Sequence, residues 1–75
     1  MLKPEQIRMA RAGLKWSLTD AAKKSGVSGN TINRIENGAG SRTDSIVSLQ
    51  TAFEKAGIVF GADGSVRLLE RRQRK

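Results

Sequence analysis

The sequence contains neither cysteine nor histidine, and these absences narrow the possible functions. Disulfide cross-links require cysteine, and most zinc and copper sites use one or both residue types. Histidine is also the commonest general acid or base in enzymes, and the remaining residues assemble no cluster of nucleophile, base and oxyanion donors. The composition therefore predicts a protein that is not an enzyme and that holds no metal and no cofactor.

Aromatic residues and long apolar runs are also scarce. The aromatic residues are Trp16, Phe53 and Phe60, and this small number argues against binding of single-stranded nucleic acid by base stacking. Trp16 fits a core position between two helices better than a stacking site. No segment has the length and apolar character of a membrane span or a signal peptide, so we expect a soluble, cytoplasmic protein.

Acidic residues are few relative to basic ones. Lysine and arginine number 14 against 7 aspartate and glutamate residues, which gives a net charge of +7. An excess of this size favours a polyanionic partner, although charge alone does not distinguish DNA from RNA or a membrane surface. The chain has 75 residues, enough for one small domain with a compact core.

The first half of the chain contains signals for two short helices. Pro4 suits the first position of a helix, because its missing N–H would be unpaired there anyway, and Gly13 suits the end. Ser17 is a good N-cap for the second helix, Asp20 completes a capping box, and Gly26 can end the helix in the left-handed conformation. The buried stripe of the first helix is expected at Ile7, Ala10 and Leu14.

Two further helices are expected after a short turn. The third begins at the N-cap Ser28 and stops at Gly38, and the fourth begins at the cap Thr43 and ends at Gly57. The fourth is the most clearly amphipathic segment of the chain. Its apolar residues, spaced three and four apart, are Ile46, Leu49, Phe53 and Ala56.

The apolar period changes from helical to two after residue 57. The runs "IVF" and "SVRLL" flank the turn-rich tetrapeptide "GADG", which predicts a β-hairpin over residues 58–69. A single domain is therefore expected over residues 1–69, followed by a basic, flexible tail over residues 70–75 that can add non-specific attraction to DNA. Arg71, Arg72, Arg74 and Lys75 supply the charge of that tail.

The hairpin has two possible roles. An isolated two-stranded ribbon is marginally stable and leaves its edges unpaired, so it needs a partner surface. One hypothesis is that residues 58–69 form a homodimer interface. The other is that the hairpin covers one end of the helical core with Ile58, Phe60, Val66 and Leu68.

The third helix carries a polar stripe along one face. Residues three and four apart on a helix share a face, and here that face contains three amides and one guanidinium. These groups can make bidentate hydrogen bonds to adenine and guanine in the major groove, whereas the alternative is a merely solvated helix face. The polar residues are Asn30, Asn33, Arg34 and Asn37, and the apolar residues opposite them are Ile32 and Ile35.

Several spaced positions of this segment resemble the helix-turn-helix of the XRE family, which includes lambda repressor and Cro. The matching residues are Ala22, Gly26, Val27, Ile32 and Ile35, together with the closing sequence "IENG". The resemblance covers residues 4–57. It implies a mainly α, lambda repressor-like bundle of about four helices, here followed by the C-terminal β-hairpin.

The resemblance also places the DNA contacts. Base-contacting positions fall on Gly29, Asn30, Asn33 and Arg34. Gly29 lacks the side chain that the family often uses, and Leu18 replaces a common phosphate-binding glutamine, although its backbone N–H at a helix N-terminus still attracts phosphate. We assign phosphate contacts to Ser17, Leu18, Lys23, Lys24, Ser28, Thr31, Asn37 and Arg42. In the family a glutamate at the position of Glu36 pairs with a basic residue at the position of Arg11, which implies a structural ion pair.

These features predict a sequence-specific transcriptional regulator, a repressor that binds double-stranded DNA as a homodimer with helix 28–37 in the major groove. One alternative is the antitoxin of a toxin–antitoxin pair that represses its own operon, although the chain has little length for holding a toxin. Another is a protein-interaction module on the same fold, which the polar stripe argues against.

Overall fold

The computed structural model describes residues 2–40 and 42–69, and the expected basic tail lies outside these residues. The elements are α1 (Pro4–Leu14), α2 (Leu18–Ser25), α3 (Gly29–Glu36), α4 (Thr43–Lys55), β1 (Ile58–Phe60) and β2 (Val66–Leu68). The two strands form one antiparallel hairpin. This architecture confirms the predicted fold class of about four helices followed by a β-hairpin.

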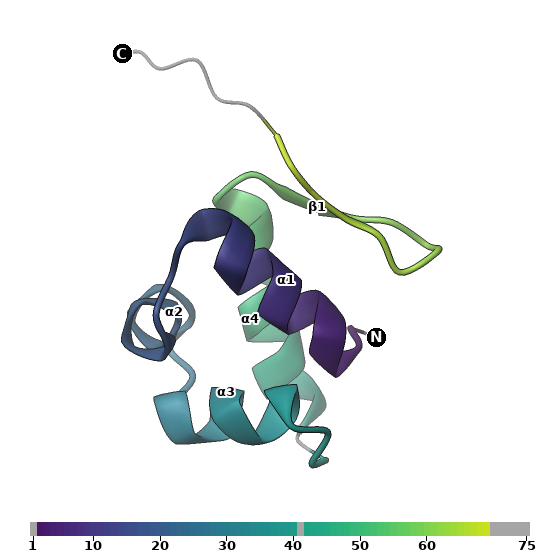
Figure 1. Cartoon of the computed structure of the whole chain (residues 1–75). Coiled ribbons are helices and arrows are strands. Elements are labelled where there is room, and N and C mark those ends of the chain that lie inside the picture. Colours follow the sequence, from purple (N-terminus) through teal and green to yellow (C-terminus); the bar gives the residue numbers. More distant parts are fainter. Residues whose placement is uncertain (1, 41, 70–75) are drawn as a thin grey trace.

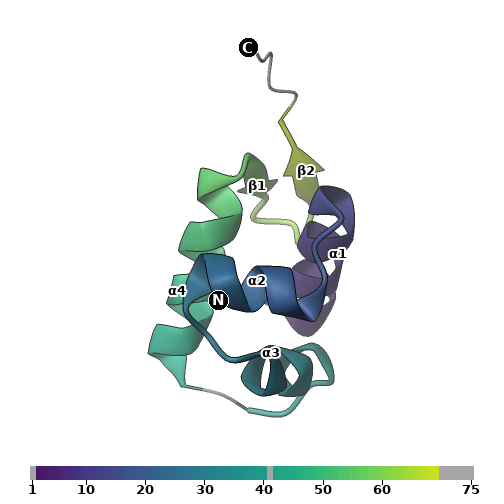
Figure 2. The same ribbon diagram turned by 90° about the vertical axis from the view of Figure 1, so that its left-hand side faces the viewer.

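The helices pack around one apolar core, with α3 and the hairpin at opposite ends of the molecule (Figure 1). In the view turned by 90°, α2 lies across the end of α3, β1 is on the side of α4, and β2 is on the side of α1 (Figure 2). Phe53 is completely buried between Trp16, which stacks on it at 5.5 Å between ring centroids, and Phe60, which meets it edge-on at 6.1 Å. The buried cluster consists of Ile7, Ala10, Ala21, Val27, Ile32, Ile35, Ile46, Leu49, Phe53 and Ile58.

The caps of α2 and α3 confirm the sequence prediction. The Ser17 hydroxyl accepts a hydrogen bond from the Asp20 N–H at 3.0 Å, and the Asp20 carboxylate accepts one from the Ser17 N–H at 3.0 Å. Gly26 then ends α2 in the left-handed conformation. The Ser28 hydroxyl caps α3 by accepting a hydrogen bond from the Thr31 N–H, and Gly38, at φ 87°, follows the last turn of the helix. The two helices and their connecting turn are therefore specified locally.

The end of α1 differs from the prediction. Gly13 lies inside the helix, which continues to Leu14, and the left-handed residue that follows is Lys15 at φ 59°. The Trp16 N–H donates to the Arg11 carbonyl at 2.9 Å and closes the turn. The physical reason is tertiary: the helix must end where Trp16 can reach the core, and a lysine takes the conformation that glycine would adopt without strain.

This arrangement predicts that one substitution at each of these two positions will stabilise the protein. Lys15→Gly removes left-handed strain and should add about 1 kcal/mol to the free energy of unfolding. Gly13→Ala has open space at the added carbon and should add roughly 0.5–1 kcal/mol through helix propensity. Thermal unfolding measures both, at about 4–8 °C per kcal/mol for a domain of this size. A lower melting temperature for Lys15→Gly would contradict the assigned end of α1.

The start of α4 also differs by one residue. Thr43 is the first residue of the helix rather than its cap, and Arg42 occupies the cap position without a side-chain hydrogen bond to the helix. The Arg42 guanidinium instead pairs with Asp44 in the first turn of α4, with Nε–Oδ1 3.1 Å. That carboxylate lies near the positive end of the helix dipole, where it compensates in part for the missing cap.

The hairpin packs three of its four predicted residues against the helices. Ile58 is 3% exposed, and Phe60 and Val66 are partly buried against the core. Leu68 was expected to join them but is 48% exposed. The hairpin therefore covers the core along most of its length, and its open end leaves an apolar side chain in solvent.

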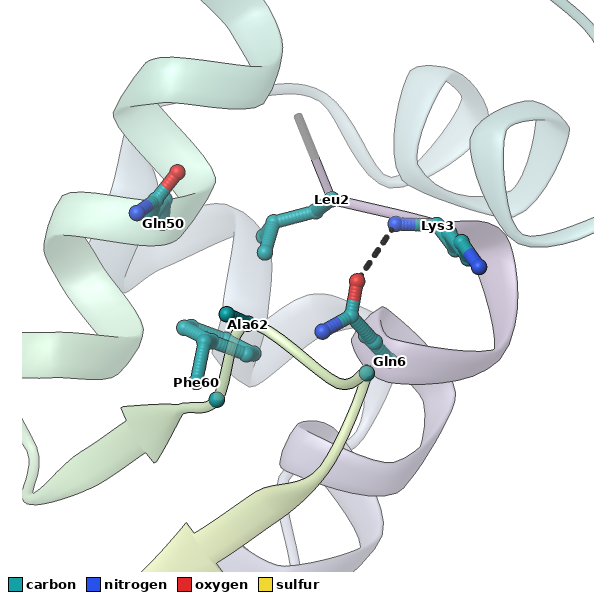
Figure 3. A pocket seen from close by; sticks show the side chains of 8 residues that line it. Leu2, Lys3, Gln6, Gln50, Phe60 and Ala62 are labelled. Carbon is teal, nitrogen blue, oxygen red and sulfur yellow. Dashed lines mark hydrogen bonds between the residues drawn. The ribbon is translucent and has the colours of Figure 1, made fainter.

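A hollow of about 210 Å³ lies between the turn of this hairpin and the start of α1 (Figure 3). Its wall includes Gln6, which is only 5% exposed although it is polar. The Gln6 Oε1 accepts a hydrogen bond from the backbone N–H of Lys3 at 2.8 Å, so the side chain helps to cap α1 (Figure 3). The apolar stripe of the first helix does not predict this cap, because Gln6 is a polar residue.

Candidate nucleic-acid interface

The turn between α2 and α3 is held by its own hydrogen bonds. The Ser25 hydroxyl donates to the Ala21 carbonyl at 2.7 Å and accepts from the Val27 N–H at 3.1 Å. Val27 is 8% exposed and anchors the turn in the core. The Ser28 hydroxyl accepts from the Thr31 N–H at 3.2 Å, which fixes the first turn of α3. These contacts set the orientation of α3 relative to α2.

The α3 helix presents its polar stripe to solvent. Asn30, Asn33, Arg34 and Asn37 are all exposed, whereas Ile32 and Ile35 are 0% and 4% exposed. Within the stripe, the Asn37 Nδ2 donates to the Asn33 Oδ1 at 3.3 Å. Apart from that contact, the described residues give these side chains no hydrogen-bond partner. The stripe therefore offers donors and acceptors that an outside surface can use.

The buried side of α3 is tied to α1 by an ion pair. The Arg11 guanidinium contacts both carboxylate oxygens of Glu36, with Nε–Oε2 2.7 Å and Nη2–Oε1 3.0 Å. The hydrogen bond to Glu36 raises the pKa of Arg11 above its ordinary value. Glu36 is 4% exposed, and its backbone carbonyl also accepts a hydrogen bond from Arg8. The two arginines thus meet the negative end of the α3 dipole and hold the helix in place.

Arg8 was missed by the sequence analysis. It lies three residues before Arg11 on the same helix, so the helical period could have placed both side chains near the end of α3. Its partner is a backbone carbonyl, which no side-chain pattern reveals.

A hollow of about 240 Å³ beside α3 is lined by three of the predicted contact residues. Arg34 from α3 and Arg42 from the start of α4 both line it. The hydroxyl-bearing residues Thr31 and Ser45 complete most of the wall. Guanidinium and hydroxyl groups are the donors that bind phosphate oxygens, so this hollow suits the backbone of a nucleic acid.

An acidic residue next to this hollow, which the sequence did not predict as part of the site, already pairs with one of its two arginines. Asp44 pairs with Arg42 through two hydrogen bonds, at 3.1 Å and 3.3 Å, and both side chains are exposed. The Arg42 guanidinium lowers the pKa of Asp44 below its ordinary value, so the carboxylate is charged at neutral pH. The signal was available: an acid two residues after the arginine, in the first turn of α4.

The remaining predicted phosphate contacts are more dispersed. The Ser17 hydroxyl is already used as a cap, and Asp20 places a carboxylate at the same helix end. Leu18 is half-buried against the core. Lys23 and Lys24 are exposed in the last turn of α2, and Lys24 lines a separate hollow with residues of α4. These side chains do not join the hollow beside α3.

Gly29 lies where α2 and α3 approach each other. A Cβ added there would be 3.9 Å from the Leu18 Cβ, an ordinary van der Waals distance. The backbone at position 29 therefore leaves room for a side chain. The base contact is missing there because this sequence has a glycine at that position.

Removal of the competing carboxylate should strengthen DNA binding. Asp44→Asn frees Arg42 and removes a negative charge beside the hollow, so affinity for random duplex DNA should rise about threefold to tenfold at low salt, with a salt dependence steeper by about one phosphate contact. Asp63→Asn is the matched control, because Asp63 is an exposed acid in the hairpin turn. Binding by fluorescence anisotropy at several salt concentrations measures both variants. Equal gains for both would show that net charge alone is responsible.

Within the described residues, no helix is long and apolar enough to span a bilayer, and no group of three or more potential metal ligands occurs.

The comparison with known proteins agrees with this geometry. A family model described as helix-turn-helix matches residues 7–55, which include α2, the turn and α3 in full. None of the curated proteins matches the chain. Because the family match covers more than half of the sequence, and because α3 presents its polar stripe beside a basic hollow, the chain belongs to the XRE or lambda repressor-like helix-turn-helix family of DNA-binding transcription regulators.

Proposed function

We propose that this protein is a sequence-specific repressor of transcription that inserts α3 into the major groove of double-stranded DNA. The observation that carries the proposal is the exposed stripe of amides and one guanidinium on α3, whose opposite face is anchored by buried isoleucines and by the Arg11–Glu36 ion pair. A reading helix must be fixed in orientation while its side chains remain free, and α3 meets both conditions.

The stripe suggests which bases are read. Arg34 has the planar fork of donors that matches O6 and N7 of guanine, and it is the first candidate for direct readout. Asn30 and Asn33 each have an amide that can pair with adenine N6 and N7. The hydrogen bond from Asn37 to Asn33 favours one orientation of the Asn33 amide, with its oxygen toward Asn37.

Phosphate contacts complete the proposed interface. Arg42, Ser28 and Thr31 lie around the start of α3 and of α4, where their donors can reach the backbone beside the occupied groove. Their role is to position α3 rather than to select a sequence.

Repression follows from occupancy of the operator. Helix-turn-helix proteins extend their site by binding two half-sites about 34–36 Å apart as a dimer, and we propose the same for this chain. Two copies would double the number of base contacts and make occupancy strong enough to exclude other proteins.

Selection of bound sequences from a random duplex pool tests the proposal. The expected result is enrichment of one motif with guanine and adenine at fixed positions, bound in preference to random DNA at raised salt. A pool that stays random after selection would contradict the proposal and would favour the protein-interaction module.

A further inference from the structure

The hollow between the hairpin turn and the start of α1 contains a buried donor group. Gln6 is 5% exposed, and its Oε1 accepts a hydrogen bond from the Lys3 N–H at 2.8 Å. That bond fixes the orientation of the amide, because a backbone N–H can pair only with the oxygen. Within residues 2–40 and 42–69, no acceptor pairs with the Gln6 Nε2. A buried donor is costly to leave unpaired, so this nitrogen is a candidate contact for a ligand.

The amide nitrogen of Gln6 is directed into the hollow. In Figure 3 it points toward the segment that carries Ala62, on the side of the amide away from Lys3. The hollow has a volume of about 210 Å³ and is lined by residues from the start of the chain, from α1, from α4 and from the hairpin. None of the described lining residues carries a predicted DNA contact, so the hollow is separate from the polar stripe of α3.

The surroundings of this nitrogen favour a negatively charged acceptor. The hollow lies at the N-terminal end of α1, which is the positive end of the helix dipole. Lys3 lines the hollow, and its exposed side chain adds a positive charge at the same helix end. None of the described lining residues is acidic, and Glu5 in the first turn of α1 is exposed and does not line the hollow.

Apolar side chains form another part of the wall. Leu2 and Phe60 both line the hollow, and both are partly buried against the core. They can cover a short alkyl group, which gains by leaving water. Drug-sized ligands occupy pockets of about 300–1,000 Å³, so this smaller hollow limits a ligand to roughly ten non-hydrogen atoms or fewer.

We propose that this hollow binds a small carboxylate with a short, branched alkyl tail. One carboxylate oxygen accepts a hydrogen bond from the Gln6 Nε2, and a bond of this kind is strengthened by the charge of the acceptor. The tail lies against Leu2 and Phe60. The bound carboxylate joins the start of α1 to the hairpin, two parts of the molecule that are far apart in the sequence.

An NMR titration of the full chain with isovalerate, without DNA and at constant ionic strength, tests the proposal. The expected result is a saturable shift of the Gln6 side-chain amide and of the Gly61 and Ala62 backbone amides, with a Kd of about 0.1–10 mM for a ligand of this size. Acetate lacks the tail and isovaleramide lacks the charge, so each should bind at least fivefold more weakly. No saturable shift with isovalerate, or equal affinity for either comparison ligand, would overturn the proposal.

Variants of the wall test the contacts. Gln6→Glu keeps an oxygen for the Lys3 N–H but replaces the donor with a carboxylate oxygen, so it should weaken isovalerate binding at least tenfold. Lys3→Gln removes one exposed charge and should weaken binding about twofold to fivefold. Val47→Glu is the matched control, because it changes the net charge equally at a side chain that is 53% exposed outside this hollow, and it should leave the Kd unchanged.

Two outcomes with these variants would contradict the site. Equal affinity of Gln6→Glu and the wild-type protein for isovalerate would overturn it. If Gln6→Glu failed to fold, equal affinities of Lys3→Gln and Val47→Glu would overturn it instead. No DNA is present in these measurements, so they decide the carboxylate site independently of whether α3 reads a sequence.

Discussion

Arg34→Ala is expected to abolish most of the preference for the selected operator over random DNA. A bidentate contact between arginine and guanine is worth about 1–3 kcal/mol of discrimination against a wrong base, which corresponds to roughly 5-fold to 150-fold per half-site. The free protein should keep its stability, because the Arg34 side chain is exposed and makes no hydrogen bond within the described residues. Competition binding with specific and random duplexes measures the change.

Two matched variants separate base reading from charge. Arg34→Lys keeps the positive charge but loses the planar fork, so its salt dependence should be preserved while its selectivity falls. Arg42→Ala removes a guanidinium from the same hollow but should weaken specific and random binding alike. If Arg34→Lys retained full selectivity, Arg34 would be a phosphate contact and not a base-reading residue.

Arg11→Ala is expected to destabilise the protein about as strongly as truncation of a buried core side chain. It leaves the Glu36 carboxylate, 4% exposed, without its charged partner. Breaking a buried pair costs about 3–5 kcal/mol, and the lower end applies because the Arg11 side chain is 25% exposed. A domain of this size has a total stability of roughly 4–11 kcal/mol, so the melting temperature should fall by about 10–25 °C.

A double substitution distinguishes loss of the pair from loss of packing. Arg11→Met combined with Glu36→Leu removes both charges and keeps apolar volume, so most of the lost stability should return. The exposed Arg42–Asp44 pair is the matched control, and Arg42→Ala should leave the melting temperature unchanged, since both side chains are in water. A small effect of Arg11→Ala would show that α3 is held by its isoleucines alone.

The elements that could be predicted from sequence were those with strong local signals. Ser17 with Asp20, Gly26 and Ser28 each satisfy backbone groups within three or four residues, so their roles do not depend on distant parts of the chain. The apolar spacing of α4 also identified its buried face, because helical period and burial coincide there.

The errors arose where tertiary contacts override a local preference. Glycine is the usual residue after a helix, yet α1 passes Gly13 and ends before Lys15, because Trp16 must stack on Phe53. Leu68 alternates correctly with its neighbours, but the core ends before it along the strand, so it stays exposed. Neither outcome can be obtained from the residue types alone.

In the candidate site, too, the features with a regular sequence pattern were predicted and the features that depend on particular partners were not. Periodicity placed the amides and Arg34 on the outward face of α3, and the structure shows them there. The partners of charged side chains were harder to predict: Arg8 binds a backbone carbonyl, and Asp44, two residues after Arg42, pairs with its guanidinium, so part of the predicted phosphate-binding surface is already neutralised within the chain. Sequence patterns identify which side chains are outside, but they give no signal for a partner that is a backbone carbonyl, such as that of Glu36.

The most direct test of the central claim is an NMR titration of the protein with its selected duplex at a salt concentration that suppresses random binding. Chemical-shift changes are expected to concentrate on the backbone of α3 and on the side-chain amides of Asn30 and Asn33, with smaller changes at Arg42. Changes confined to the hairpin or to α1, with the α3 amides unaffected, would contradict that claim.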